Sequence, residues 1–504
     1  MQRLTCGRCA LVLAIACAPL FGGVAHAKGK VEENNETVYL ARDFVFVDSP
    51  AIEGYLRGVC KRLLDAKGVK LEGPNILVQS SDAFNAFTDA HGNLVISTGA
   101  LRSLESEDEL AALLGHELSH LILKHPQDKD AMRVLPLGME TMSSMKDAAT
   151  ELRGRGDVQA TSVLWSDFIA PSWNRKQEQE ADENGFELMR AAGYDPSTFG
   201  QLFSKLRDAE KKRSERMQVL KKALVARLRE AAPDTKIQAV SMTGEVGNAV
   251  ADGASEKLID GLAAFNRSYE SPDERQTHLA VYAREHREKK RAAHPEAGFQ
   301  EALQMGEGGT MLTLDGAALG TLDALARKNA AAARTAVESL GTGETKQTSA
   351  HLNLALGSYQ QAYGKPEAGA AAAQSWLLAT HPSAQAFLWS ASYKVKARDY
   401  EGALETLESG RMRVGDSTPF MPTLIATARA SGNLALAREY TKECRAESSR
   451  DSGLLQSVVS RQSSQSTLYA ECVRQLGEKP AEDAVAESVV GKARESVFNL
   501  LRKK

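Results

Sequence analysis

The chain has few cysteines outside its N-terminus. Three of the six precede Lys28, which leaves Cys60, Cys444 and Cys472. None of these three has C-x-x-C spacing, so neither a redox motif nor a cysteine zinc site is indicated. Cys444 and Cys472 both fall in a helical C-terminal region. We predict that they form a disulfide and that Cys60 is a small buried hydrophobic residue.

The chain also lacks an excess of charge of either sign. Lys and Arg number 62 against 65 Asp and Glu, for a formal net charge of −3 over 504 residues. This balance argues against a nucleic-acid partner and against a strongly basic membrane patch. After the first residues, nothing approaches the roughly 18 uninterrupted apolar residues of a membrane helix. The mature chain is therefore expected to have no transmembrane segment.

The N-terminus has the form of a cleaved secretory signal peptide. Arg3 and Arg8 precede an apolar run over residues 10–24, and Ala25-His26-Ala27 is an A-x-A cleavage site. Cys17 raises the alternative of a lipoprotein, but the residues before it lack the expected leucine. We predict maturation before Lys28 and a periplasmic location, with peripheral attachment to the outer membrane as an option.

The most informative motif present is His116-Glu117-Leu118-Ser119-His120, an HExxH pattern. On an α-helix, positions i and i+4 share a face, so both imidazoles can reach one zinc ion. The Glu117 carboxylate then lies where it can take a proton from a water molecule bound to the metal.

The surroundings of the motif predict a helix. Ser106 followed by Glu109 resembles a capping box, and the two acidic residues between them suit a helix N-terminus. Apolar residues then recur at helical spacing. Gly115 would allow close approach of another backbone, and Pro126 would end the helix.

A catalytic zinc ion needs a third protein ligand and an open position for water. The best candidate is Glu178, which forms an E-x-x-x-D pattern with Asp182 on one helical face. The glutamate would bind the metal, and the aspartate would accept a hydrogen bond from a ligand imidazole. An E-x-x-x-D pattern by itself is more often a solvated acidic surface, but the upstream HExxH favours the metal interpretation.

Several motifs together resemble a known family. In order, they are Asn85-Ala86-Phe87, residues 92–101, residues 108–111, the HExxH and the run from Arg175 to Asp182. The series closely resembles the metallopeptidases of the CAAX prenyl protease and HtpX family over roughly Val38 to Gly193. The periplasmic branch of that family, the β-barrel assembly-enhancing proteases, adds tetratricopeptide repeats to the peptidase domain.

The resemblance implies a fold and roles for individual residues. The fold would be α+β but mostly α, with a gluzincin-type peptidase domain, a small β-hairpin or sheet and an all-α repeat domain. His116, His120 and Glu178 would bind one Zn2+ per chain, Glu117 would be the general base, and Asp182 would orient a ligand histidine.

A hairpin is expected over residues 85–97, around a turn at His91-Gly92-Asn93. Its edge at Asn85, Ala86 and Phe87 could hold an extended peptide by strand addition. The alternative is that the hairpin only packs on the HExxH helix, and both can be true.

One departure from the family concerns Tyr269. Family members often have a Thr-His-Pro segment, with an arginine six residues after the histidine, and that histidine can hold the enzyme latent. The best match here runs from Ser268 to Arg275 and has Tyr269 in place of the histidine. A neutral phenol, with a reference pKa of about 10, is a poor zinc ligand. We therefore predict that the latch is missing and that Tyr269 hydrogen-bonds the oxyanion or gates the site; the alternative is an alignment shifted by an insertion.

The length of the chain predicts at least two domains. We place a signal peptide at 1–27, a zinc metallopeptidase domain at 28–290, a linker or helical transition at 291–345 and a tetratricopeptide-like repeat domain at 346–504. In the last domain, small residues recur 34 apart at Gly369, Ala403 and Ala437, each after a turn. This period is typical of stacked helix–turn–helix repeats, and a plain helical bundle is the alternative.

The predicted function is that of a periplasmic zinc endopeptidase. By resemblance, its substrates would be unfolded or misassembled proteins, mainly of the outer membrane, and the repeats would contact the barrel-assembly machinery. The alternative is a latent or non-catalytic repeat scaffold or chaperone that assists outer-membrane protein assembly.

Overall fold

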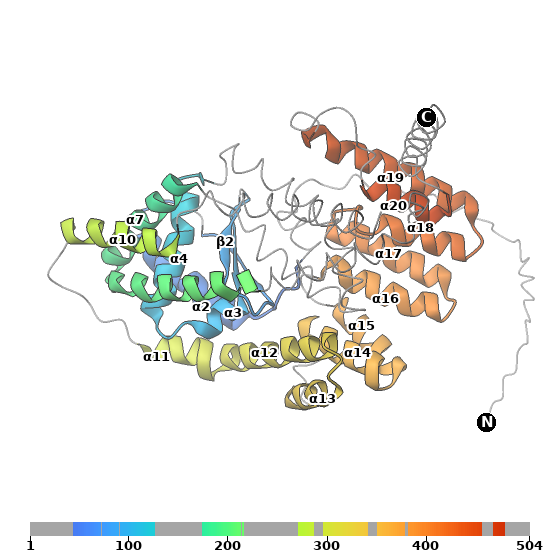
Figure 1. Ribbon diagram of the computed structural model, residues 1–504, viewed down its shortest axis with the longest axis horizontal. Coiled ribbons are helices and arrows are strands. Elements are labelled where there is room, and N and C mark those ends of the chain that lie inside the picture. Colours follow the sequence, from blue (N-terminus) through green and yellow to red (C-terminus); the bar gives the residue numbers. More distant parts are fainter. Residues whose placement is uncertain are drawn as a thin grey trace, which may run out of the picture. The chain divides into compact units, whose positions relative to one another are not determined.

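The structure is a computed structural model. It describes residues 44–71, 73–89, 91–125, 174–212, 214–215, 271–286, 296–340, 350–378, 382–455 and 467–478. The predicted signal peptide, Cys17 and Tyr269 lie outside these residues. The described part is mostly helical with one small sheet (Figure 1), which confirms the predicted α+β class.

The sheet has three strands in the order β1-β3-β2. β1 (Asn75–Gln79) pairs in parallel with β3 (Asn93–Ser97), and β2 (Ala86–Thr88) pairs with β3 in antiparallel fashion. Every residue of the central strand β3 is buried. The predicted hairpin is therefore confirmed: Asp89 accepts the N–H groups of His91 and Asn93, and Gly92 takes the left-handed conformation at φ 80°.

Helices pack against this sheet and against one another to form the core of the N-terminal region. They are α2 (Pro50–Ala66), α3 (Thr98–Ser103), α4 (Glu107–Ile122), α7 (Arg175–Ala192), η2 (Pro196–Thr198) and α10 (Pro272–Glu285). In α2, Ser49 caps the N-terminus and Pro50 occupies the first turn, where its missing N–H costs nothing. Its apolar residues at helical spacing face the core, and the free thiol of Cys60 is buried among them as predicted.

The range predicted as a transition is helical over most of its described residues. It contains α11 (Glu296–Phe299), the π-helix η4 (Gln300–Met305), α12 (Glu307–Ala326) and α13 (Ala330–Ser339). Helix α12 packs on α3 and on α14 (Ala350–Tyr363). Its Asp315 is fully buried, receives a hydrogen bond of 2.6 Å from Ser80 Oγ and pairs with Arg102 Nη1 at 2.9 Å. The ion pair fixes α12 to α3, and the hydrogen bond from Ser80 fixes it to the end of β1.

We expect Asp315→Ala to lower the free energy of unfolding by about 3 kcal/mol, because it leaves the Arg102 guanidinium without its buried partner. Asp323→Ala is the matched control, since Asp323 lies on the same helix in an exposed pair with Arg327 and should cost less than about 1 kcal/mol. Urea unfolding followed by circular dichroism measures both. Equal losses in the two variants would show that the buried pair contributes no more than the exposed one.

The C-terminal helices form pairs along the chain. Beyond α14, they are α15 (Pro366–Trp376), α16 (Ala384–Lys396), α17 (Tyr400–Val414), α18 (Met421–Ala430), α19 (Leu434–Leu455) and α20 (Thr467–Leu476). α14 packs on α15, α16 on α17, and α18 on α19, and each pair contacts the next. Ala403 and Ala437 are fully buried, and a β-carbon at Gly369 would approach Gly357 O at 3.2 Å. These close contacts are compatible with repeats, whose tetratricopeptide identity stays a prediction.

Candidate metal centre

Helix α4 presents the HExxH motif. Ser106 caps it and accepts the N–H of Glu109 at 3.2 Å, as predicted. The second half of the capping box is different, because the Glu109 carboxylate accepts the N–H of Glu105 at 2.9 Å instead of that of Ser106. The helix ends at Ile122, before Pro126.

Helix α7 supplies the E-x-x-x-D residues. Asn174 and Gln177 form a reciprocal capping box at its N-terminus, and Gly193 ends it in the left-handed conformation. The cap fixes where the helix begins, so Glu178 lies in the first turn and Asp182 one turn later, both buried.

The two helices cross at a pair of glycines. A β-carbon on Gly185 would lie 3.0 Å from the backbone nitrogen of His116 and 3.1 Å from the carbonyl carbon of Gly115. The predicted close approach at Gly115 is therefore present. It brings the backbone of α7 against the residue that carries the first imidazole.

Gly185→Ala should separate the helices by a few tenths of an ångström. We expect it to lower the free energy of unfolding by about 1–3 kcal/mol, as for an overpacked core, and to weaken zinc binding. Gly320→Ala in α12 is the control, because nothing lies within 4 Å of the added carbon, and it should be neutral or stabilising. Isothermal titration with zinc and chemical unfolding test both effects; unchanged zinc affinity would show that the crossing does not set the ligand geometry.

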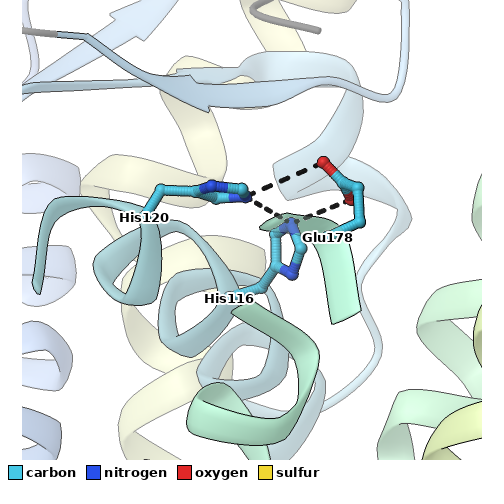
Figure 2. Close-up of side chains that lie close together, drawn as sticks. All are labelled: His116, His120 and Glu178. Carbon is cyan, nitrogen blue, oxygen red and sulfur yellow. Dashed lines mark hydrogen bonds and ion pairs between the residues drawn. The ribbon is translucent and has the colours of Figure 1, made fainter. Parts of the chain in front are cut away.

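Three buried side chains bring ligand atoms to one point (Figure 2). His116 Nε2 lies 3.1 Å from His120 Nε2 and 3.6 Å from Glu178 Oε2, and His120 Nε2 lies 3.8 Å from Glu178 Oε1. Ligand atoms in a tetrahedral zinc site with bonds of about 2.0–2.1 Å are about 3.3 Å apart. The three distances lie on either side of that value, so His116, His120 and Glu178 can hold a metal ion.

The two ligand imidazoles differ in their surroundings. Burial acts to lower the pKa of His116, but Asp182 and Glu178 raise it above its usual value in the metal-free site. His116 Nδ1 lies 2.9 Å from Asp182 Oδ1, so this nitrogen donates and Nε2 keeps its lone pair for the metal. Burial, followed by the charge of His116, holds the pKa of His120 well below its usual value. His120 is therefore neutral, as a metal ligand must be.

Arg275 of α10 neutralises the two carboxylates of α7. Its Nη1 lies 2.6 Å from Glu178 Oε2, and it reaches Asp182 by two bonds, from Nη2 at 2.6 Å and from Nε at 2.9 Å. Burial acts to raise the pKa of Asp182, but Arg275 and His116 together lower it to about 2. Asp182 is thus a charged acceptor that orients His116.

The proposed base, Glu117, follows His116 on α4. Its side chain is buried, and its Oε2 has no hydrogen-bond partner among the described residues. Burial raises its pKa to about 7. A carboxylate with a pKa near neutrality is well matched to general acid–base work.

The raised pKa of Glu117 predicts a pH-dependent stability of the metal-free protein. Below about pH 4.5 the Glu117 carboxyl is protonated in both the folded and the unfolded state, so the stabilisation is fully present. As the pH rises from there through about 7, the unfolded state releases a proton that the folded state retains, and the free energy of unfolding falls. From pH 5 to pH 8, metal-free wild type should therefore lose up to about 3 kcal/mol relative to Glu117→Gln. Urea unfolding of both proteins in a chelator at the two pH values measures this; a constant difference would contradict the raised pKa.

The hairpin lies against the HExxH helix. Strand β2 packs on α4, and Thr88 Oγ1 donates to Glu117 O at 3.5 Å. Within the described sheet β2 is an edge strand, with Asn85 just before it and Ala86 and Phe87 in it. The alternative of packing on the helix is thus present, while strand addition by a peptide stays a prediction.

The structure brings together most of the residues selected from the sequence. His116, Glu117, His120, Glu178 and Asp182 form one site, and Cys444 and Cys472 are joined by a disulfide between α19 and α20. Arg275 was noted only as part of a motif match and had no role assigned. His125, 2.9 Å from His120, was missed, because a histidine five residues after HExxH is on no recognised spacing.

Comparisons with known proteins agree with this geometry. Residues 50–235 match the model of peptidase family M48. The β-barrel assembly-enhancing protease of Yersinia pestis is 29% identical over 164 residues, which cover 32% of this chain and 33% of that protein. The metalloprotease LoiP of Escherichia coli is 27% identical over 157 residues, covering 31% and 61%.

A third relative is mitochondrial. The metalloendopeptidase OMA1 of Arabidopsis thaliana is 30% identical over 131 residues, which cover 26% of this chain and 25% of that protein. The chain spans about a third of the length of the β-barrel assembly-enhancing proteases that it matches. The matches and the HExxH–Glu178 cluster fall in the same part of the chain, so residues 50–235 are similar to the peptidase domain of family M48.

Proposed function

We propose that this chain is a zinc-dependent endopeptidase. The observation that carries the proposal is the convergence of His116, His120 and Glu178, with ligand atoms all within 4.8 Å of one another, beside the buried carboxylate of Glu117. Two histidines and a glutamate are the ligand set of a catalytic zinc site, which keeps a fourth position open.

Each residue of the site has a separate role in the proposed reaction. A bound zinc ion would supply Lewis acidity toward a peptide carbonyl and toward water. Glu117 accepts a proton from the attacking water and passes it to the departing amide nitrogen, so that the peptide bond breaks into a carboxylate and an amine. Asp182 keeps His116 in the metal-binding tautomer, and Arg275 keeps Asp182 charged.

The biological setting also belongs to the proposal. The N-terminal residues have the form of a secretory signal, and the relatives include β-barrel assembly-enhancing proteases. We place the enzyme in the periplasm, where it would cleave misfolded or misassembled outer-membrane proteins. The helical pairs after residue 350 would contact substrates or the assembly machinery. No helix among the described residues has the length and apolar character needed to span a membrane.

The proposal is tested by offering the purified protein two substrates, one unfolded and one folded. Unfolded casein and a tightly folded protein of similar size are incubated with it, and the products are identified by mass spectrometry. Internal cuts in casein that a zinc chelator abolishes support an endopeptidase of unfolded chains. Intact casein, together with suppressed aggregation of an unfolded outer-membrane protein, would favour the non-catalytic chaperone.

A further inference from the structure

The second histidine of the motif has an oriented partner of its own. His120 is fully buried, and its Nδ1 lies 2.9 Å from Nδ1 of His125, which is also buried. The two rings meet edge to face, with centroids 5.0 Å apart and planes at 68°. This is the geometry of a hydrogen bond between two imidazoles.

The position of the metal site fixes the direction of this bond. His120 faces His116 Nε2 and Glu178 with its own Nε2, so that nitrogen carries the lone pair for the metal. Its Nδ1 must then carry the hydrogen and donate it, and His125 Nδ1 must accept. A neutral imidazole has one donor and one acceptor nitrogen, so His125 keeps its own hydrogen on Nε2.

The far nitrogen of His125 has a suitable acceptor. His125 Nε2 lies 3.4 Å from Glu180 Oε2, and Lys176 holds the other oxygen of that carboxylate at 3.3 Å. Glu180 lies on α7, two residues after Glu178. A chain of polar groups therefore runs from the second ligand through His125 and back to the helix that supplies the third ligand.

The turn at the end of α4 places His125 beside His120. After the helix ends at Ile122, Lys124 adopts a left-handed conformation with φ 59° and turns the chain back. Lys328 and Arg398 make the same turn after α12 and α16, so the turn alone is an ordinary helix ending. After α4 it is followed by a histidine whose ring returns to the last turn of the helix.

We propose that His125 is a positioning residue for the metal site, which holds His120 in the tautomer and ring orientation that bind zinc. It does for His120 what Asp182 does for His116, with a neutral imidazole in place of a carboxylate. The inference rests on the zinc site of the proposed function but not on its peptidase activity.

The test measures the zinc dissociation constant of the purified full chain by competition with a chromogenic chelator. His125→Phe keeps a ring of similar size and removes the acceptor, and we expect it to raise the constant about 10–100-fold. His125→Asn places an amide oxygen near the position of Nδ1 and should restore most of the affinity. The control is His278→Phe, because His278 pairs with Glu183 of the same helix α7 at 3.5 Å and lies in no described contact with a ligand.

Thermal unfolding of the metal-free variants shows whether a variant loses zinc affinity only because its fold is destabilised, which separates positioning from a merely structural role. Positioning predicts a loss of zinc affinity in His125→Phe that is larger than in His278→Phe and is rescued in His125→Asn. Zinc affinity at the wild-type value in His125→Phe, or Asn and Phe variants equally weak in zinc binding, would overturn the inference. A wild type that binds zinc but cleaves nothing would contradict only the proposed function, whereas one that binds no zinc would overturn both.

Discussion

Glu117→Gln is expected to reduce the rate of peptide cleavage by about 10²–10⁴-fold while zinc binding is retained. Glutamine keeps the size and buried position of the side chain but cannot accept the proton of the attacking water. The proposed zinc ligands His116, His120 and Glu178 are untouched by the change. The prediction is therefore a loss confined to the chemical step, with kcat reduced and KM nearly unchanged.

The measurement is a steady-state assay with an unfolded protein substrate, with metal content determined on the same sample. Glu183→Gln is the control, because Glu183 is a part-exposed carboxylate on the ligand helix that pairs with His278 and lies outside the metal-binding group. Its cleavage rate should stay far above that of Glu117→Gln. Cleavage by Glu117→Gln at the wild-type rate would remove Glu117 from the mechanism.

Arg275→Leu is expected to lower the stability of the metal-free protein by about 3–5 kcal/mol. The guanidinium is mostly buried and pairs with both Glu178 and Asp182. Its removal leaves two carboxylates close together without a neutralising cation. Zinc should then recover part of the lost stability, because the ion binds only the folded state and restores positive charge at Glu178.

Two further variants make the Arg275 prediction specific. Arg207→Leu removes an arginine that pairs with Asp273 of α10 at a more exposed position, and should cost less than about 1 kcal/mol. Combining Arg275→Leu with Asp182→Asn removes both partners of the ion pair, so the double variant should lose less than the sum of the single losses. Additive losses in urea unfolding would mean that Arg275 and Asp182 have no interaction energy with each other.

The sequence predicted the ligands because their spacing is local. His116 and His120 lie one turn apart on a helix whose Ser106 cap is also readable, and Glu178 and Asp182 repeat that spacing. The hairpin at residues 85–97 was predicted for the same reason, since its turn residues and strand residues are neighbours in the chain.

The remaining parts of the site depend on contacts between distant segments. Arg275 reaches Asp182 across 93 residues, and nothing in the spacing of either residue reveals that contact. Asp315 lies in a range predicted as a transition, yet it pairs with Arg102 across 213 residues and fixes α12 to α3. His125 was missed for a third reason, because a left-handed residue after the helix, Lys124, redirects the chain and overrides helical spacing.

The departure at Tyr269 stays a prediction, since that residue lies outside the described part of the chain. Arg275, six residues later, lies at the two carboxylates of α7. The family segment from which the missing latch was predicted also has an arginine six residues after the latch position.

The most direct test of a zinc peptidase is a titration of metal-free protein with zinc, in which the rate of casein cleavage is followed. If His116, His120 and Glu178 hold one catalytic ion, the rate rises linearly up to one equivalent of zinc and then stays constant. The same titration of Glu117→Gln should bind one equivalent without cleavage. A rate independent of added zinc, or a protein that binds no zinc, would contradict the account.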